Sequence, residues 1–500
     1  MKKLGKLSFY READAITIYW NKPYSIYKEL SYLVQDDAGH AMEVTKTHVK
    51  LENLIPEHTY QIEVYAYGIC GDGKKMIGSF TPKTIATRHQ KEDVLVTEEA
   101  FGIVGDGKTL NTEQIQRVID LCKPNQRIVF PEGIYLTGAL NLHSDMELHL
   151  QKGAILKGTD EVKDYEPKRK SRFEGIEMEC YSSLINIGEL DHSSGYRCKN
   201  IILSGAGTIE SGGKKLAERV IASEKKRLQG YIESLGDKAL EYENENTIPG
   251  RARPRLIQIC NAKNVRISGL TLKNGASWNV HMIYSDQIVT DHCTFYSEGV
   301  WNGDGWDPDS SSNCTIFACD FYTGDDAVSV KSGKNPQGNV INRASKHIRI
   351  FDCKSMGGHG ITIGSEMSGG VRDVSIWDCD MEKSLYGVEV KATKKRGGYV
   401  KNIRVRDCVV PRILVHSVGY NDDGAAAPDA PVFSDFIFSN LEITGKCMEK
   451  DGTMHECRAV ELIGFEEKGH EIHDVHFRGG KIHGDVHMEK CSSVTFRNIE

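Results

Sequence analysis

From Asn264 onward the chain repeats one short pattern, and this repeat most restricts its fold. Strand-like segments alternate with polar corners, as in "NVRISGLTLKN", "QIVTDHCTFYS", "NCTIFACDFYT", "HIRIFDCKSMG" and "DVSIWDCDMEK". Cysteines at positions 293, 319, 353, 379 and 408 are separated by 26, 34, 26 and 29 residues. A period in the twenties without a recurring amphipathic helix is typical of a solenoid of stacked strands. The pattern therefore predicts an all-β fold, a right-handed parallel β-helix.

The chain contains 14 cysteines but no CxxC pair, which argues against a zinc ribbon or a thioredoxin-like motif. Thiols that recur in a repeat are expected to form a buried packing column rather than disulfides. Cys447 and Cys457 flank a short loop and would pair only in an oxidising compartment, so we expect free thiols there too.

The first 88 residues differ from the rest. Segments such as "AITIYWNKP", "LSYLVQD" and "LENLIPEHTYQIEVYAYG" read as short alternating strands between turns, which predicts a small β-sandwich. Trp20, Pro23 and the "LENLIPEHTYQIEVYA" stretch make it resemble a fibronectin type III domain, with an expected role as a spacer or packing module. Residues 89–96 then form a linker, and 97–500 form the β-helix.

Two segments are predicted to be helical. In "NTEQIQRVIDLC", Asn111 or Thr112 caps a helix that would cover the open end of the solenoid. Residues 214–250 form a helical insertion, and loops inserted on one face of a solenoid often shape its binding surface. The apolar stripe of the insertion is Leu216, Val220, Leu228, Ile232 and Leu235.

The net charge of −7 gives no reason to expect nucleic acid or a membrane as partner, and no apolar run approaches a membrane span. The N-terminus is basic but lacks an apolar core and a cleavage site, so no signal peptide is predicted. We expect a cytoplasmic protein, or a secreted one if the numbering begins at a mature start. The sequence leaves the oligomeric state open.

Four segments align internally: "DGWDPDS", "DAVSVKS", "HGITIGS" and "YGVEVKA". Their third and fifth positions suit an interior, so positions one, four and six should face outward. Because stacked strands lie about 4.8 Å apart, the outward residues should gather into columns. The columns are Asp304, Asp326, His359 and Tyr386; then Asp307, Ser329, Thr362 and Glu389; then Asp309, Lys331, Gly364 and Lys391.

Asp325 lies in the turn before its strand, so local geometry can direct it to the same surface as Asp304 and Asp326. Clustered carboxylates raise one another's pKa, and one can stay protonated at neutral pH. A protonated acid beside ionised carboxylates suits glycosidic cleavage. A solvated acidic ladder or a calcium site is the alternative, but the spacing does not match an EF-hand loop. We expect no metal and no cofactor.

At these residues the chain resembles glycoside hydrolase family 28, the polygalacturonase family. The family's Asn-Thr-Asp appears as "NGD" at 302–304, its Asp-Asp as Asp325–Asp326, and its Gly-His-Gly around His359. Its Arg-Ile-Lys is replaced by "EVK" at 389–391. Further matches are "GTIESGG", the stretch "RPRLIQICNAKNVRISGLTLKNGASWNVH" ending at His281, and "GSEMSGGVRDV", and the resemblance covers roughly residues 97–500.

The resemblance implies inverting hydrolysis without a cofactor. Asp325 would be the general acid, while Asp304 and Asp326 position and deprotonate water, with the carboxyls about 6.5–9.5 Å apart. His359 would orient or tune the acid, and Lys391, aided by Lys331, would grip a substrate carboxylate. The other implied substrate-binding residues are Asn302, His281, Glu366, Tyr386 and Glu389.

Glu389 is the main departure from the family's motifs, because a carboxylate there repels a galacturonate carboxylate. Either Lys394, Lys395 and Arg396 of "KKRGG" compensate, or Glu389 bonds sugar hydroxyls. The "GSEMSGGVR" stretch and the insertion resemble bacterial exo-acting members. The expected function is therefore exo cleavage of alpha-1,4-galacturonosyl linkages in pectic oligogalacturonides.

Three alternatives remain. One is hydrolysis of rhamnogalacturonan or another substituted pectin within the same family. A pectate lyase would use calcium and a basic residue, which the acid-rich site disfavours. A non-catalytic carbohydrate-binding β-helix would leave the aspartates and His359 unexplained.

Overall fold

The computed structural model describes residues 2–71, 73–193, 195–420 and 422–500. The chain divides into two compact units, 1–93 and 94–500. The division falls within the eight residues that the sequence assigns to a linker.

The N-terminal unit is β-rich. Its strands form a six-stranded sheet of order β1-β8-β7-β4-β5, with β9 paired to β7, and a three-stranded sheet of order β2-β3-β6. One core joins the two sheets, and within it Trp20 lies edge-on to Tyr32 with ring centroids 5.1 Å apart. The strands are β1 (Lys3–Lys6), β2 (Ser8–Arg11), β3 (Ile16–Tyr19), β4 (Leu30–Asp36), β5 (Ala41–Val44), β6 (His48–Leu51), β7 (Thr59–Cys70), β8 (Gly73–Thr81) and β9 (Lys83–Ala86).

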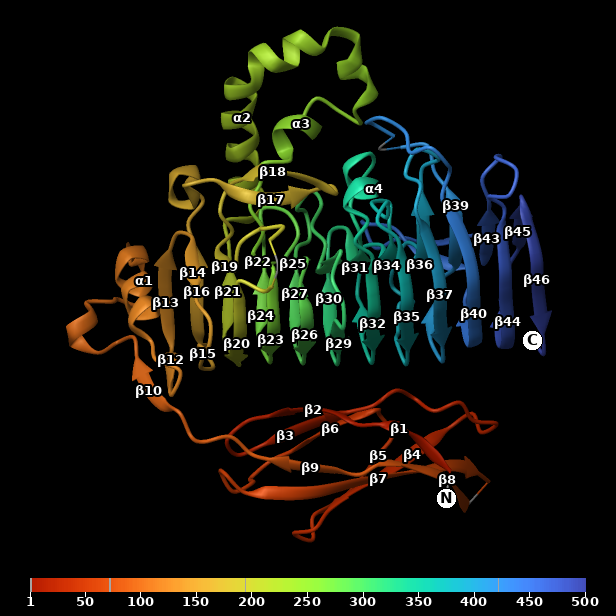
Figure 1. The fold of residues 1–500 in the computed structure, drawn as a ribbon, viewed down its shortest axis with the longest axis horizontal. Coiled ribbons are helices and arrows are strands. Elements are labelled where there is room, and N and C mark those ends of the chain that lie inside the picture. Colours follow the sequence, from red (N-terminus) through yellow and green to blue (C-terminus); the bar gives the residue numbers. More distant parts are fainter. Residues whose placement is uncertain (1, 72, 194, 421) are drawn as a thin grey trace. The chain divides into compact units, whose positions relative to one another are not determined.

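The C-terminal unit is the predicted parallel β-helix. Its strands stack into parallel sheets of 14, 8 and 11 strands, whose members recur coil after coil (Figure 1). The 14-stranded sheet comprises β10 (Glu92–Leu95), β12 (Gln126–Phe130), β15 (Glu147–Leu150), β20 (Cys198–Gly205), β23 (Ala262–Ser268), β26 (Asp286–Asp291), β29 (Thr315–Phe317), β32 (Ser345–Phe351), β35 (Val371–Trp377), β37 (Tyr399–Arg406), β38 (Val409–Val410), β40 (Val432–Ile443), β44 (Ile472–Ile482) and β46 (Cys491–Arg497).

The 8-stranded sheet comprises β11 (Asp106–Leu110), β13 (Gly133–Thr137), β16 (Ala154–Gly158), β21 (Thr208–Glu210), β24 (Thr271–Lys273), β27 (Thr294–Tyr296), β30 (Asp320–Tyr322) and β33 (Lys354–Ser355). The 11-stranded sheet comprises β14 (Leu140–Leu142), β19 (Ile185–Ile187), β22 (Ile257–Cys260), β25 (Val280–Ile283), β28 (Trp306–Asp309), β31 (Asp326–Val330), β34 (Gly360–Ile363), β36 (Gly387–Ala392), β39 (Ile413–Ser417), β43 (Val460–Ile463) and β45 (Val486–Glu489).

The interior of the solenoid is apolar and continuous. The positions that the internal alignment assigned to the interior, such as Trp306, Val328 and Ile361, are fully buried in one core. The five repeated cysteines are buried free thiols, which confirms a packing column rather than disulfides. Cys447 and Cys457 are also free in the structure.

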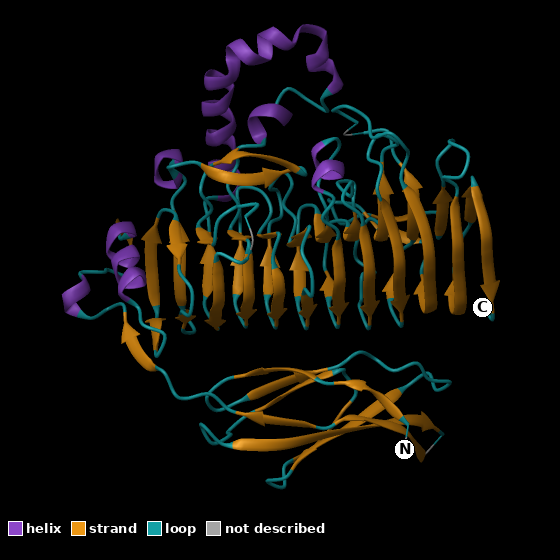
Figure 2. Cartoon of the chain, viewed as in Figure 1, coloured by secondary structure: helices purple, strands orange, loops and turns teal. Residues whose placement is uncertain are grey.

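Helices lie outside the sheets (Figure 2). The predicted cap is α1 (Thr112–Leu121), whose Ile115, Val118 and Ile119 are buried in the solenoid core. The insertion is helical as predicted, although only the first two of its five stripe residues are buried. Its elements are α2 (Gly213–Leu235), η3 (Gly236–Glu241) and α3 (Thr247–Gly250); elsewhere lie η1 (Glu99–Phe101), η2 (Val162–Tyr165) and α4 (Gln337–Ile341).

A second insertion was not predicted. The antiparallel hairpin of β17 (Arg169–Phe173) and β18 (Ile176–Cys180) leaves the chain between β16 and β19 and runs across the strands of the 11-stranded sheet (Figure 1). A shorter hairpin pairs β41 (Lys446–Met448) with β42 (Met454–Glu456). Within the part of the chain that the structure describes, no helix combines the length and apolar character needed to cross a membrane.

Candidate active site

The outward face of the 11-stranded sheet carries a row of polar residues. Ser329 of β31 pairs with Thr362 of β34, which pairs with Glu389 of β36, as the internal alignment predicts. At the other end of the row, His281 pairs with Asp307. The register thus brings residues more than a hundred positions apart onto one surface.

The first predicted column is offset. A register shift after Asp326 pairs this residue with Gly360 rather than with His359, and regular pairing resumes at Val328 with Ile361. The internal alignment of the four segments missed this shift because it allowed no extra residue in any segment. The irregularity leaves His359 in the turn before β34, where it still reaches Asp326.

Asp326 is held by three side chains. Ser329 Oγ donates to Oδ2 at 2.9 Å and Thr362 Oγ1 donates to Oδ1 at 2.8 Å, while His359 Nδ1 lies 3.2 Å from Oδ1. Burial alone would raise the pKa of Asp326, but the charge of Lys391 and the contact with His359 hold it well below its usual range. Asp326 is therefore an oriented, ionised carboxylate.

His359 also contacts Asp325, with Nδ1 2.8 Å from Oδ1. Burial would lower the pKa of His359, but its bonds to Asp325 and Asp326 raise it to about 9. The Tyr386 ring lies beside it, with centroids 4.8 Å apart. Asp325 is the most accessible of the three predicted catalytic aspartates, with 22% of its side chain exposed. His359 thus joins both members of the Asp-Asp pair as a cation.

Asp304 and Asp307 are fully buried neighbours. Burial, and then the charge of Asp307, raises the pKa of Asp304 well above its usual range. Burial and the nearby carboxylates likewise raise the pKa of Asp307, although Lys331 opposes them. Neither oxygen of Asp307 has a hydrogen-bond partner among the described residues. The protonated carboxyl expected in the cluster therefore belongs to this pair. Asp307 stood in a predicted column but was not predicted as a site residue.

Lys331 connects Asp304 to a second carboxylate. Its Nζ lies 3.5 Å from Asp304 Oδ2 and 3.4 Å from Glu366 Oε2, and 5.0 Å from the centre of the Trp278 ring. Burial would raise the pKa of Glu366, but Lys331 and other nearby cations lower it to about 2. Lys331 is thus shared between two internal carboxylates rather than free in solvent.

Glu389 and Lys391 form a buried ion pair. Lys391 Nζ lies 2.8 Å from Glu389 Oε2, and His416 Nε2 lies 2.8 Å from Oε1. The Lys391 ammonium also faces the rings of Tyr386 and Tyr420. His416 and Tyr420 were missed from the sequence. His416 of β39 pairs with Lys391 of β36. Extending the internal alignment by one coil would therefore have found His416.

The β17–β18 hairpin covers the outward face next to Asp307. Ser171 Oγ donates to Gln258 of β22 at 2.7 Å, and Arg172 Nη1 lies 2.7 Å from Asp309 Oδ1 at the end of β28. Phe173 stacks on Trp278 with ring centroids 4.7 Å apart. The hairpin therefore covers the row over β22 and β25 and reaches the end of β28.

Two predicted substrate-binding residues, His281 and Asn302, are engaged by neighbouring side chains. His281 is fully buried against Trp278, and burial lowers its pKa to about 4. Asn302 Oδ1 accepts a hydrogen bond from Arg253 at 2.6 Å. Arg253 is itself fully buried, which lowers its pKa to about 9. His281 and Asn302 therefore contact side chains that support the site.

Asp325, Asp326 and His359 offer three ligand atoms within 4.8 Å of one another. A metal would need a neutral imidazole. The two carboxylates instead favour the protonated ring, because they raise the pKa of His359 to about 9. This arrangement suits acid–base chemistry better than metal ligation.

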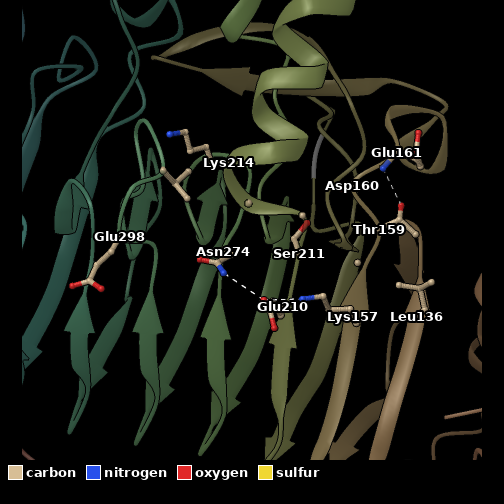
Figure 3. A pocket seen from close by; sticks show the side chains of 14 residues that line it. Leu136, Lys157, Thr159, Asp160, Glu161, Glu210, Ser211, Lys214, Asn274 and Glu298 are labelled. Carbon is tan, nitrogen blue, oxygen red and sulfur yellow. Dashed lines mark hydrogen bonds and ion pairs between the residues drawn. The ribbon is translucent and has the colours of Figure 1, made fainter. Parts of the chain in front are cut away.

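A separate polar pocket of about 550 Å³ lies at the start of α2 (Figure 3). Several of its charged groups are paired with each other or with neighbours, for example Lys157 with Glu210 at 2.8 Å and Asp160 with Lys215. None of the predicted site residues lines it. Its rim includes Glu298 and Val300 of the loop that precedes Asn302.

The fold and the carboxylate cluster together define a parallel β-helix with a site suited to glycosidic cleavage. Comparison with known proteins agrees: the model of glycosyl hydrolases family 28 matches residues 188–499. The chain belongs to this family and is a glycoside hydrolase.

Relatives span most of the chain. An exo-poly-alpha-D-galacturonosidase of Dickeya chrysanthemi is 25% identical, over 94% of this chain and 81% of the relative. A probable polygalacturonase of Vitis vinifera is 33% identical, over 61% of this chain and 58% of its own length.

Two solved structures are similar. A family 28 exopolygalacturonase of Yersinia enterocolitica matches with a TM-score of 0.80 and 21% identity, over 100% of this chain and 96% of the other, which supports the fold. A hyperthermoactive exopolygalacturonase of Thermotoga maritima matches with a TM-score of 0.67 and 27% identity, over 82% of this chain and 91% of the other.

Proposed function

We propose that this enzyme is an inverting hydrolase that releases units from one end of pectic oligogalacturonides by cleaving alpha-1,4-galacturonosyl linkages. The observation that carries the proposal is the cluster of Asp304, Asp325, Asp326 and His359 beside a covered stretch of the same face. The Dickeya, Yersinia and Thermotoga relatives are exopolygalacturonases by name, which supports both the substrate and the exo action.

The proposed chemistry uses the carboxyls in different roles. Asp325 is partly exposed and lies 2.8 Å from the protonated imidazole of His359, so a proton can pass through it to a leaving glycosidic oxygen. Asp326, ionised and held by Ser329 and Thr362, takes a proton from the attacking water, while Asp304 positions that water. The bond from C1 to the leaving oxygen breaks as that oxygen takes the proton from Asp325. Water adds its oxygen to C1, and one proton of this water passes to the Asp326 carboxylate.

The β17–β18 hairpin supports exo action. It occupies the outward face over β22 and β25, so a sugar chain lying along the row cannot continue past β28 in that direction. The insertion also approaches the site. Burial raises the pKa of its Glu243, and the charges of Glu174 and Asp325 raise it further. A substrate would then enter end first and extend over β34 and β36.

Digestion of long polygalacturonate with the purified full-length chain tests the proposal. We expect reducing ends and one small product by chromatography, with inversion at C1 observed by proton NMR during the first turnovers. A gain in ultraviolet absorbance would indicate a lyase product. A ladder of sizes would contradict exo action, and no turnover of any galacturonide would contradict the function itself.

For the N-terminal unit we infer a fibronectin type III-like domain that acts as a spacer or packing module. Its two sheets, antiparallel except where β1 pairs with β8, enclose Trp20 and support this likeness. Deletion of residues 1–88 is expected to leave kcat on short oligogalacturonides unchanged.

A further inference from the structure

Beyond the hairpin, the row continues from β31 toward β36, and Glu389 and Lys391 lie there. Glu389 pairs through the backbone with Thr362, whose hydroxyl bonds Asp326 at 2.8 Å. A sugar unit beside the one bound at Asp326, on the side away from the hairpin, therefore lies over the Glu389–Lys391 pair. This step rests on the proposed function, because it takes the sugar chain to run along the row.

The pair is buried and internally compensated. Glu389 is 2% exposed and Lys391 is 8% exposed. Burial would raise the pKa of Glu389, but Lys391 and His416 lower it, so the carboxyl is ionised at neutral pH. Burial would lower the pKa of Lys391, but Glu389 and then Asp326 raise it well above its usual range. The two charges cancel, and the ammonium is already engaged.

A substrate carboxylate meets Lys391 at this position, and this ammonium is already paired with Glu389. To reach Lys391 it would have to displace Glu389 at 2.8 Å or stand beside it, and two carboxylates that share a buried site repel each other strongly. His416 does not supply the missing charge, because it lies between Glu389 and Glu461, 2.8 Å and 3.8 Å away.

An uncharged sugar unit meets none of these costs. The Glu389 carboxylate accepts hydrogen bonds from hydroxyls, Lys391 donates to ring or ester oxygens, and Tyr386 and Tyr420 flank the ammonium with aromatic faces. We propose that the subsite over Glu389 and Lys391 selects an uncharged sugar unit of pectin, such as a methyl-esterified galacturonate or a neutral sugar, over a free galacturonate.

Matched trisaccharides test this directly. Trigalacturonate is compared with the same trisaccharide carrying one methyl ester at each position in turn, and with one whose unit at that position is rhamnose. For the wild type we expect kcat/KM to be about tenfold higher for the substrate with an uncharged unit in this subsite, equivalent to about 1.4 kcal/mol. The ester and rhamnose arms distinguish the two uncharged chemistries.

Two variants sharpen the result. Glu389→Gln frees Lys391 and is expected to remove or reverse the preference in favour of the free acid. Glu461→Gln is the matched control, because Glu461 approaches His416 but lies two strands beyond Glu389 and makes no ion pair with Lys391. It should keep the wild-type preference.

The wild-type measurement stands even if a variant folds poorly. Equal or better cleavage of trigalacturonate by the wild type would overturn this inference while leaving the proposed function in place. Failure to cleave any galacturonide, esterified or not, would instead contradict the proposed function.

Discussion

His359 Nδ1 lies 2.8 Å from Asp325 Oδ1 and 3.2 Å from Asp326 Oδ1, so one imidazole serves both adjacent aspartates. The contacts raise the pKa of His359 to about 9 against an ordinary 6.5. Because the folded state holds this proton more tightly than the unfolded chain, the added stability is complete below about pH 6.5 and is lost as the pH rises through about 9.

We therefore expect the wild type to lose on the order of 3 kcal/mol of unfolding free energy, relative to His359→Gln, between pH 6.5 and 9. Urea unfolding at a series of pH values measures the difference. Parallel pH profiles for wild type and variant would show that the imidazole is not held as a cation.

Asp325→Asn should abolish hydrolysis while the fold stays intact, because the amide cannot deliver a proton to the leaving oxygen. We expect kcat to fall by about 10²–10⁴-fold. Asp320→Asn, at an exposed position of the same coil, is the control and should behave as wild type. Circular dichroism and the thermal midpoint report the fold. Retention of normal turnover by Asp325→Asn would remove this residue from the acid role.

The sequence predicted the solenoid because apolar residues recur at the positions that are buried in each coil. Residues such as Val328 and Ile361 alternate with polar neighbours, and the alignment of four coils placed Ser329, Thr362 and Glu389 in their observed register. The shift after Asp326 escaped because a single irregular residue leaves no periodic signal.

The β17–β18 hairpin, which covers part of the outward face, could not be predicted in the same way. Arg172 belongs to an antiparallel hairpin inserted once, and its partner Asp309 lies 137 positions away. No repeat connects the two residues, so only the folded chain brings them together. The ion pairing of Lys391 with Glu389 escaped for another reason: alternation placed both on one face but could not show that their charges cancel.

Weakening the hairpin should change the products. Arg172→Met removes the partner of Asp309 and loosens the cover over β25, so long polygalacturonate should bind across the site and yield a mixture of sizes. Lys170→Ala, at an exposed position in the same strand, is the matched control. Chromatography of early digestion products provides the measurement. If Arg172→Met is folded and still releases one small product, the hairpin does not limit the cleavage pattern.

Asp307 carries a stability cost that a single substitution can remove. Its carboxyl is fully buried and neither oxygen has a hydrogen-bond partner among the described residues, and burial followed by nearby carboxylates raises its pKa despite Lys331. The folded state binds the proton more tightly than the unfolded chain does, so stability falls as the pH rises from about 3.9 through the raised pKa.

Asp307→Asn stays neutral and lacks this loss. We expect the variant and the wild type to unfold at similar temperatures near pH 4, and the variant to unfold at the higher temperature at pH 7. Thermal unfolding at both pH values distinguishes this from a uniform effect of the amide, which would shift both midpoints equally.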